Sequence, residues 1–242
     1  MLAINNIELK LTRLFVAVSL AVTALVVLAA CTATDDGTIS AERFILKDAQ
    51  GQPRAELGVG TDGIPTLSFY DNGQQLRLQL GESPDGGIGL HMFDADGRPR
   101  ANVSLRSGSD PSIELFDSNG RKRATIDVSG DGSPSLVLMD SSGIARASLA
   151  ISSQGVPGLN ILDSQGNVRI DLRVWDDEVA ALILSDSSGE PHAALAASDI
   201  GPPSLVLADE QTRSRVDLRV LNGGVPNLVL TDYQGNVLFT AP

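Results

Sequence analysis

An aspartate recurs every 23 residues through most of this chain, with no insertion or deletion between one copy and the next. An internal repeat of constant length indicates an array of similar structural units, and it limits the fold class more than any other feature. The units occupy nearly all of the 242 residues after residue 41, so we expect a single repeat domain over residues 42–242. The nine aspartates are Asp48, Asp71, Asp94, Asp117, Asp140, Asp163, Asp186, Asp209 and Asp232.

The residues on either side of each aspartate alternate between apolar and polar. Counting the aspartate as position 0, positions −4 and −2 are apolar in all nine units, as at Leu136 and Leu138. Position +7 is Ala, Leu, Ile, Val or Phe in every unit, and position +9 is Leu, Val or Ile in all but the last. Because successive side chains of a strand point to opposite faces, this pattern predicts two half-buried strands per unit.

Turn residues separate the predicted strands. Glycine stands at position +3 in seven units, as at Gly120, which gives the sequence Asp-x-x-Gly. The aspartate can cap the backbone amides of the turn, and glycine accepts backbone conformations that are closed to other residues. All nine aspartates are therefore predicted to be structural, turn-capping residues. Proline at position −6, as at Pro134, is expected to open the first strand, where its missing N–H does least harm.

The apolar pattern also predicts the register of each hairpin. A three-residue loop with a glycine bulge would place position −2 opposite +6, which is arginine in seven units. A four-residue loop instead places −2 opposite +7 and −4 opposite +9, so that cross-strand pairs on one face are apolar. Since a slip of one residue exchanges the two faces of a strand, we expect the four-residue loop, with the arginine opposite position −1.

Nine such hairpins make an all-β domain of eighteen short strands with one apolar face. A flat sheet of that size would leave a large apolar face and two free edges in solvent, which proteins avoid. We expect the hairpins to close into a shallow, wide barrel or ring. The alternatives are a two-sided β-solenoid, with −4 and −2 packed against +7 and +9, and two open sheets that dimerise face to face.

The N-terminal segment has the pattern of a processing signal rather than of a folded element. Lys10 and Arg13 precede a mostly apolar, uncharged run from Phe15 to Ala30. The run is short for a membrane span, and it ends in the sequence Leu28-Ala29-Ala30-Cys31. This ending resembles a bacterial lipobox. The alternative is an uncleaved anchor helix that contains an incidental cysteine.

The lipobox resemblance implies a lipoprotein that is held in the cell envelope by a lipid anchor. Residues 1–30 would then be a lipoprotein signal peptide, and Cys31 would become the new N-terminus and carry diacylglycerol and palmitate. Residues 31–41 would form a flexible tether between the lipid and the fold. Thr32, which follows the cysteine, implies the outer membrane if the host is Gram-negative. Cys31 is the only cysteine, so no internal disulfide is possible.

Tandem Asp-x-x-Gly-x-x-Arg hairpins behind a lipobox resemble the β-flower proteins, which are shallow barrels of β-hairpin petals. The resemblance covers residues 42–242 and Cys31. It implies a shallow barrel of hairpins, and it implies no catalytic or binding residue because that family has no firmly assigned activity.

Composition and motif spacing exclude several classes of function. A net charge of −12 argues against nucleic acid, whose phosphates need clustered Lys and Arg. The two histidines, His91 and His192, have no Cys, His or Ser partner at a usable spacing, so we expect no catalytic residue and no enzyme activity. The sequence from Asp94 to Gly97 resembles part of a calcium loop but lacks the further ligands and the terminal Glu, so we expect no metal and no cofactor.

The sequence leaves two functions open. The first is a non-catalytic structural or protein-interaction module, joined to the membrane through Cys31 and bound to an unknown protein. The second is a carrier or sequesterer of a lipid-like apolar ligand, because a ring of eighteen strands is too wide for its own side chains to fill. Trp175, the only tryptophan, lies in an irregular connection and is a possible partner contact, or it packs on a neighbouring strand.

Overall fold

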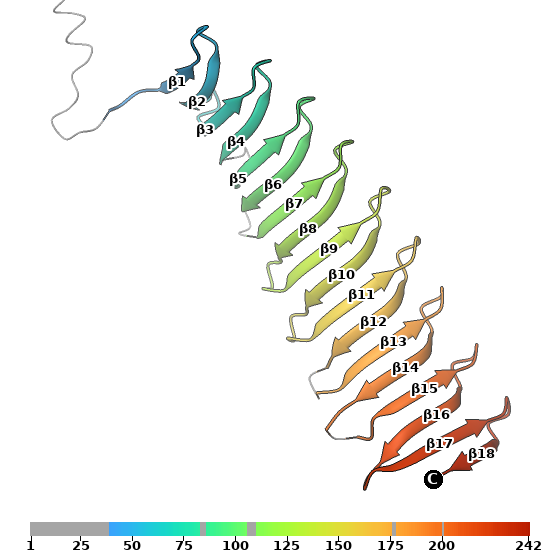
Figure 1. Ribbon diagram of the computed structural model, residues 1–242. Coiled ribbons are helices and arrows are strands. Elements are labelled where there is room, and N and C mark those ends of the chain that lie inside the picture. The colour runs from blue at the N-terminus through green and yellow to red at the C-terminus, as the bar shows by residue number, and fades with distance from the viewer. Residues whose placement is uncertain (1–38, 83–85, 106–109, 176–177, 200) are drawn as a thin grey trace, which may run out of the picture. The chain divides into compact units, whose positions relative to one another are not determined.

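The computed structural model describes residues 39–82, 86–105, 110–175, 178–199 and 201–242 (Figure 1). The repeat sheet belongs to one compact unit, Arg43–Pro242. The expected signal peptide at residues 1–30, the lipidated Cys31 and most of the tether lie outside the described residues. Those expectations therefore stay predictions.

The described part of the unit is all-β, with two strands in each 23-residue repeat and no helix. This agrees with the alternating pattern of the sequence. The eighteen strands are β1 (Arg43–Lys47), β2 (Pro53–Val59), β3 (Pro65–Tyr70), β4 (Leu76–Glu82), β5 (Ile88–Phe93), β6 (Pro99–Leu105), β7 (Pro111–Phe116), β8 (Lys122–Val128), β9 (Pro134–Met139), β10 (Ala145–Ile151), β11 (Pro157–Leu162), β12 (Val168–Val174), β13 (Ala180–Ser185), β14 (Pro191–Ala197), β15 (Ser204–Ala208), β16 (Ser214–Leu221), β17 (Val225–Thr231) and β18 (Val237–Ala241).

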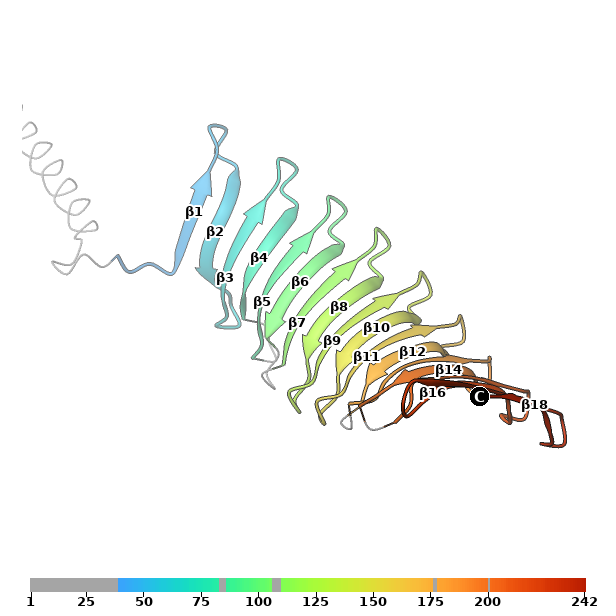
Figure 2. The ribbon, with the colours of Figure 1, turned by 60° about the horizontal axis from the view of Figure 1, so that its bottom comes forward.

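All eighteen strands belong to one antiparallel sheet in which each strand pairs with its neighbours in sequence (Figure 2). Within the described residues, β1 pairs only with β2 and β18 only with β17. The expected closed barrel is therefore wrong. The open row of hairpins is closer to the solenoid-like alternative. It differs from a two-sided solenoid because both strands of a unit lie side by side in a single layer.

The hairpin turn is a three-residue loop, not the expected four-residue loop. In the fourth unit the Asp117 N–H donates to the Arg121 carbonyl at 2.9 Å, and the Gly120 N–H donates to the Asp117 carbonyl at 3.0 Å. Gly120 has φ 75°, a left-handed conformation that glycine adopts without steric cost. A type I turn followed by such a glycine is the common three-residue hairpin connection.

A bulge next to each turn nevertheless gives the register that the apolar pattern predicts. Phe116 pairs with Lys122, but the residue before it, Leu115, pairs with Ala124. Arg123 is therefore an extra residue on its strand. A bulge of this kind opposes two residues on one strand to a single residue on the other. All nine hairpins show the shift, so −2 lies opposite +7 and −4 opposite +9. The arginine at +6 was expected opposite position −1. It occupies the bulge instead.

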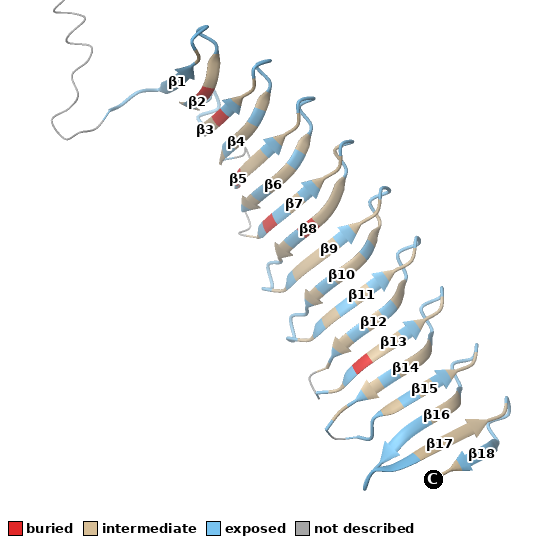
Figure 3. Ribbon diagram, in the orientation of Figure 1, coloured by how far each residue is buried: buried red, intermediate tan, exposed pale blue. Residues whose placement is uncertain are grey.

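The sheet has almost no conventional hydrophobic core. Among the described residues, the only buried apolar side chains are Ala55 and Ala181 (Figure 3). The buried polar residues are Ser68, Ser112 and Thr125. All but Ala55 lie at positions −5, −3 and +8, whose side chains share the face opposite to the leucines. We call the side formed by positions −5, −3, +8 and +10 the polar face, and the side formed by −4, −2, +7 and +9 the apolar face.

The polar face requires small side chains where neighbouring strands approach closely. A Cβ added to Gly81 on β4 would lie 2.7 Å from the Pro65 carbonyl oxygen and 2.8 Å from the Thr66 methyl group. A Cβ added to Gly89 on β5 would lie 2.9 Å from a ring nitrogen of His91. These two positions of the polar face therefore have no room for a larger side chain unless their neighbours move.

Candidate functional site: an uncovered apolar face

The apolar face carries no charged side chain at any of its four positions in any of the nine units. The turns between units continue the register of the hairpins: Ala124 pairs with Leu138 and Ile126 with Leu136 in the next unit. The residues therefore form two continuous rows across the sheet. One row joins the −2 and +7 positions, and the other joins the −4 and +9 positions.

Many of the large side chains on this face are exposed to solvent. Ile126 is 51% exposed, Leu149 is 53% exposed and Leu195 is 54% exposed, and they come from three different hairpins. Eighteen strands spaced about 4.8 Å apart give rows about 80 Å long, measured along the sheet, and an apolar surface on the order of 1,000 Å². Contiguous apolar patches on soluble monomers are rarely larger than a few hundred Å², and larger ones mark interaction sites.

The nine repeated aspartates lie at the turns and are engaged by the backbone. In every unit the Oδ1 atom accepts hydrogen bonds from the backbone N–H groups at +2 and +4. For Asp117 these donors are Asn119 at 2.8 Å and Arg121 at 3.1 Å. The Arg121 amide makes the largest contribution to a lowered pKa of Asp117, which partial burial opposes. These oxygens cap turns rather than converge on a ligand.

The arginine in each bulge joins one hairpin to the next. The Arg123 guanidinium lies 3.6 Å from the Asp117 carboxylate of its own turn and donates from Nε to the Met139 carbonyl of the next hairpin at 2.9 Å. We call this series the Asp–Arg ladder. Sequence reasoning predicted the capping but missed the second acceptor, although the constant spacing of the two residues was a signal. The other cations of the ladder are Arg54, Arg77, Arg100, Arg146, Arg169, His192 and Arg215.

His192 is the one titratable cation of the ladder at neutral pH. Its Nε2 lies 3.1 Å from the Asp186 carboxylate, and its Nδ1 lies 3.4 Å from the Ala208 carbonyl oxygen. Both ring nitrogens face acceptors, so both contacts are hydrogen bonds only when the imidazole is protonated. The bond to Asp186 is the main cause of the raised pKa of His192, burial opposes the rise, and the Ala208 carbonyl and the Glu210 carboxylate add to it.

We expect the joint between the seventh and eighth hairpins to weaken as the pH rises. Because the folded-state pKa of His192 is raised above 6.5, its contribution to stability is complete below pH 6.5 and is lost as the pH rises through the folded-state pKa. Amide hydrogen exchange in β14 and β15, corrected for its intrinsic pH dependence, should show this loss of protection. His192→Arg should remove the dependence, and identical pH profiles for the two proteins would contradict the assignment.

Trp175 contacts the polar face rather than the apolar face. Its ring lies 5.4 Å from the guanidinium carbon of Arg173, a residue of the polar face at position +10. The backbone N–H of Trp175 donates to the Val179 carbonyl at 3.0 Å, so Trp175 begins the turn between β12 and β13. A cation stacked on an indole ring accounts for its partial burial. Its possible role as a partner contact stays a prediction, separate from the uncovered apolar face.

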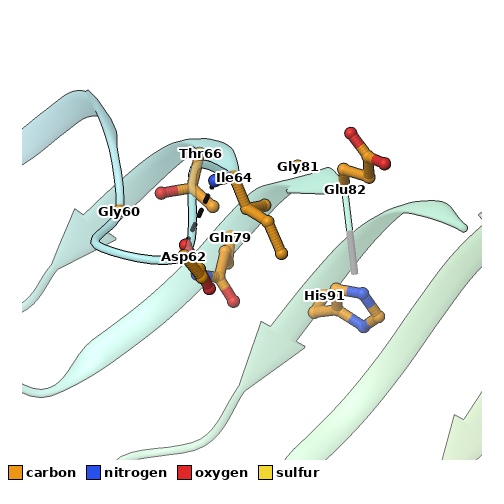
Figure 4. Close-up of a pocket in the computed structure, with 8 residues that line it drawn as sticks. All are labelled: Gly60, Asp62, Ile64, Thr66, Gln79, Gly81, Glu82 and His91. Atoms are coloured by element: carbon orange, nitrogen blue, oxygen red, sulfur yellow. Dashed lines mark hydrogen bonds between the residues drawn. The ribbon is translucent and has the colours of Figure 1, made fainter. Parts of the chain in front are cut away.

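A hollow of about 340 Å³ lies at the edge of the polar face near β3, β4 and β5 (Figure 4). Its ionisable residues do not form a reactive cluster. Asp62 accepts the Ile64 N–H at 3.1 Å, and His91 bonds to the Asn102 side chain at 3.1 Å. Across the described ranges, no group of three or more His, Cys, Asp or Glu side chains is placed to hold a metal ion. In the same ranges, no helix is long and apolar enough to span a bilayer.

Comparison with known proteins gives no family for this chain. No protein-family model matches it, and no curated protein matches it. A mutant of the Photorhabdus luminescens Tc holotoxin pore shares 12% sequence identity at a TM-score of 0.20, over 85% of this chain and 12% of that chain. The periplasmic gluconolactonase PpgL of Pseudomonas aeruginosa shares 12% identity at a TM-score of 0.20, over 84% of this chain and 85% of that chain. Likenesses this weak carry no argument about function.

Proposed function

We propose that this chain is a lipid-anchored protein of the cell envelope, and that its repeat domain is a non-catalytic structural or interaction module. The observation that carries the second part is the charge-free, uncovered apolar face of the eighteen-strand sheet. A face of this size and composition is typical of a protein that binds along a surface rather than in a pocket. The anchor rests on the sequence Leu28-Ala29-Ala30-Cys31.

An apolar-ligand carrier has less support. That alternative depended on a closed ring with a lumen, and in the described residues the first and last strands of the sheet do not pair with each other. The Asp–Arg ladder and the turns also join neighbouring hairpins edge to edge into one continuous row. A row of this kind favours a structural module over a carrier.

Cys31→Ser tests the anchor. A serine cannot form the thioether to diacylglycerol, so we expect the lipid mass to disappear and the protein to leave the membrane fraction. Mass spectrometry of the N-terminal peptide and fractionation of cells measure the two effects separately. Thr32→Ser is the matched control, because it keeps the cysteine and should leave both results unchanged. A Cys31→Ser protein that still carried lipid would overturn the proposal.

A further inference from the structure

We propose that the apolar face is covered by the same face of a second copy of this chain, packed sheet against sheet. This inference rests on the proposed function, in which that face is the interaction surface, and it names the partner. Three features of the face point to the same partner: the alternation of side-chain size, the distribution of charge and the area.

Large and small side chains alternate from strand to strand in the middle of the −2/+7 row. Leu115 on β7 pairs with Ala124 on β8, Ala124 pairs with Leu138 on β9, and Leu138 pairs with Ala147 on β10. The leucines are 49% and 46% exposed, so each is a ridge beside a gap left by an alanine. Strands are about 4.8 Å apart, so successive ridges are about 9.6 Å apart.

A second copy displaced by one strand fills these gaps. Its leucines, which have the same spacing, would lie over Ala124 and Ala147, while its alanines would receive Leu115 and Leu138. Large residues packed against small ones in this way let two layers interdigitate. A partner with a different spacing would fall out of step within a few hairpins, whereas a copy of the same repeat stays in step from β5 to β11, the stretch over which large and small residues alternate.

The charge distribution also favours a neutral sheet as the partner. The chain carries a net charge of −12, yet no charged residue lies at the four positions of the apolar face. Anionic lipid headgroups attract basic segments, which this face lacks. Two copies of the face can pack together without burying an unpaired charge, which would be strongly destabilising.

The area suits a stable dimer. Each face offers on the order of 1,000 Å², so two faces together would remove about 2,000 Å² from solvent, which lies within the range of stable protein interfaces. Two packed sheets lie about 10 Å apart with their strands within about 30° of each other.

A photo-crosslinker tests the partner in cells that produce the full-length chain. A benzophenone-bearing amino acid replaces Leu138 in one experiment and Val137 in the other, because Val137 is the adjacent apolar residue on the opposite face of β9. Two differently tagged copies are produced together. We expect irradiation to give a product of twice the chain mass, containing both tags, from position 138 and not from position 137.

The other possible products separate the identity of the partner from the existence of an interaction surface. A product of another protein mass from position 138 would overturn the second copy but leave the interaction surface intact. A lipid-sized adduct would overturn the second copy and favour the carrier. If position 138 gave no more crosslinked product than position 137, both the partner and the interaction surface would be overturned.

A second variant tests the interdigitation itself. Ala124→Trp fills one gap and should reduce the dimer-sized product from position 138, whereas Ala124→Ser keeps a small side chain and should not. Equal product from both variants would overturn the fit of leucine into the alanine gap.

Discussion

Leu138→Asp should separate copies of this chain while changing the stability of each sheet only slightly. In a single sheet Leu138 is 46% exposed, so a carboxylate at this position stays in water and costs little. In a face-to-face dimer the same carboxylate would be buried without a partner. That burial costs about 3 kcal/mol or more, which weakens association by more than about a hundredfold.

Co-purification of two differently tagged full-length copies measures this effect. Val137→Asp is the matched control, because it places the same charge on the same strand but on the polar face, and it should leave co-purification unchanged. A Leu138→Asp protein that co-purified like the wild type would mean that the apolar face is not the contact between copies. A Leu138→Asp protein that unfolded would mean that the side chain is covered within a single chain.

Asp117→Ala should loosen the fourth hairpin and its junction with the fifth. The change removes the acceptor for the Asn119 and Arg121 amides and the anionic partner of Arg123. It removes two hydrogen bonds that hold the turn in its conformation, a larger loss than that of an exposed ion pair. Hydrogen exchange in β7, β8 and β9 should show the loss of protection, while distant hairpins should change little.

Asp117→Asn separates the two contributions. The amide oxygen can still accept the turn N–H groups, so this variant loses only the charge and should be less destabilised than Asp117→Ala. The pKa of Asp117 is lowered in the fold, so its contribution is present above the unfolded-state value near 3.8 and is lost as the pH falls through the folded-state pKa. Equal loss of protection in both variants would mean that the ion pair, not the turn cap, carries the effect.

The sequence predicted the strand pairs correctly because only one register keeps the leucines on one face. Leu115 opposite Ala124 and Ile113 opposite Ile126 follow from that requirement alone. The apolar pattern alone could not distinguish a four-residue loop from a three-residue loop followed by a bulge, since both give this register. Gly120 favoured the shorter loop, because a glycine in the left-handed region at this point is typical of it.

Closure of the sheet could not be predicted from the residues. Whether eighteen strands meet in a ring depends on a small rotation between neighbouring hairpins, which accumulates over the row. The repeat pattern specifies neighbours but not that rotation. The position of Trp175 could not be predicted either, because this residue lies in a connection, outside the alternating pattern of the strands. Its ring contacts Arg173, at the end of the preceding strand.

The bulge at position +6 has a consequence for how the chain can acquire its structure. Each arginine contacts its own turn and the next hairpin but no more distant one, and in the described sheet every strand contacts only its neighbours in sequence. A hairpin can therefore complete its bonds as soon as the following 23 residues are present, without waiting for a distant segment. The hairpins can therefore form one after another as the chain is synthesised, starting from the N-terminal hairpin.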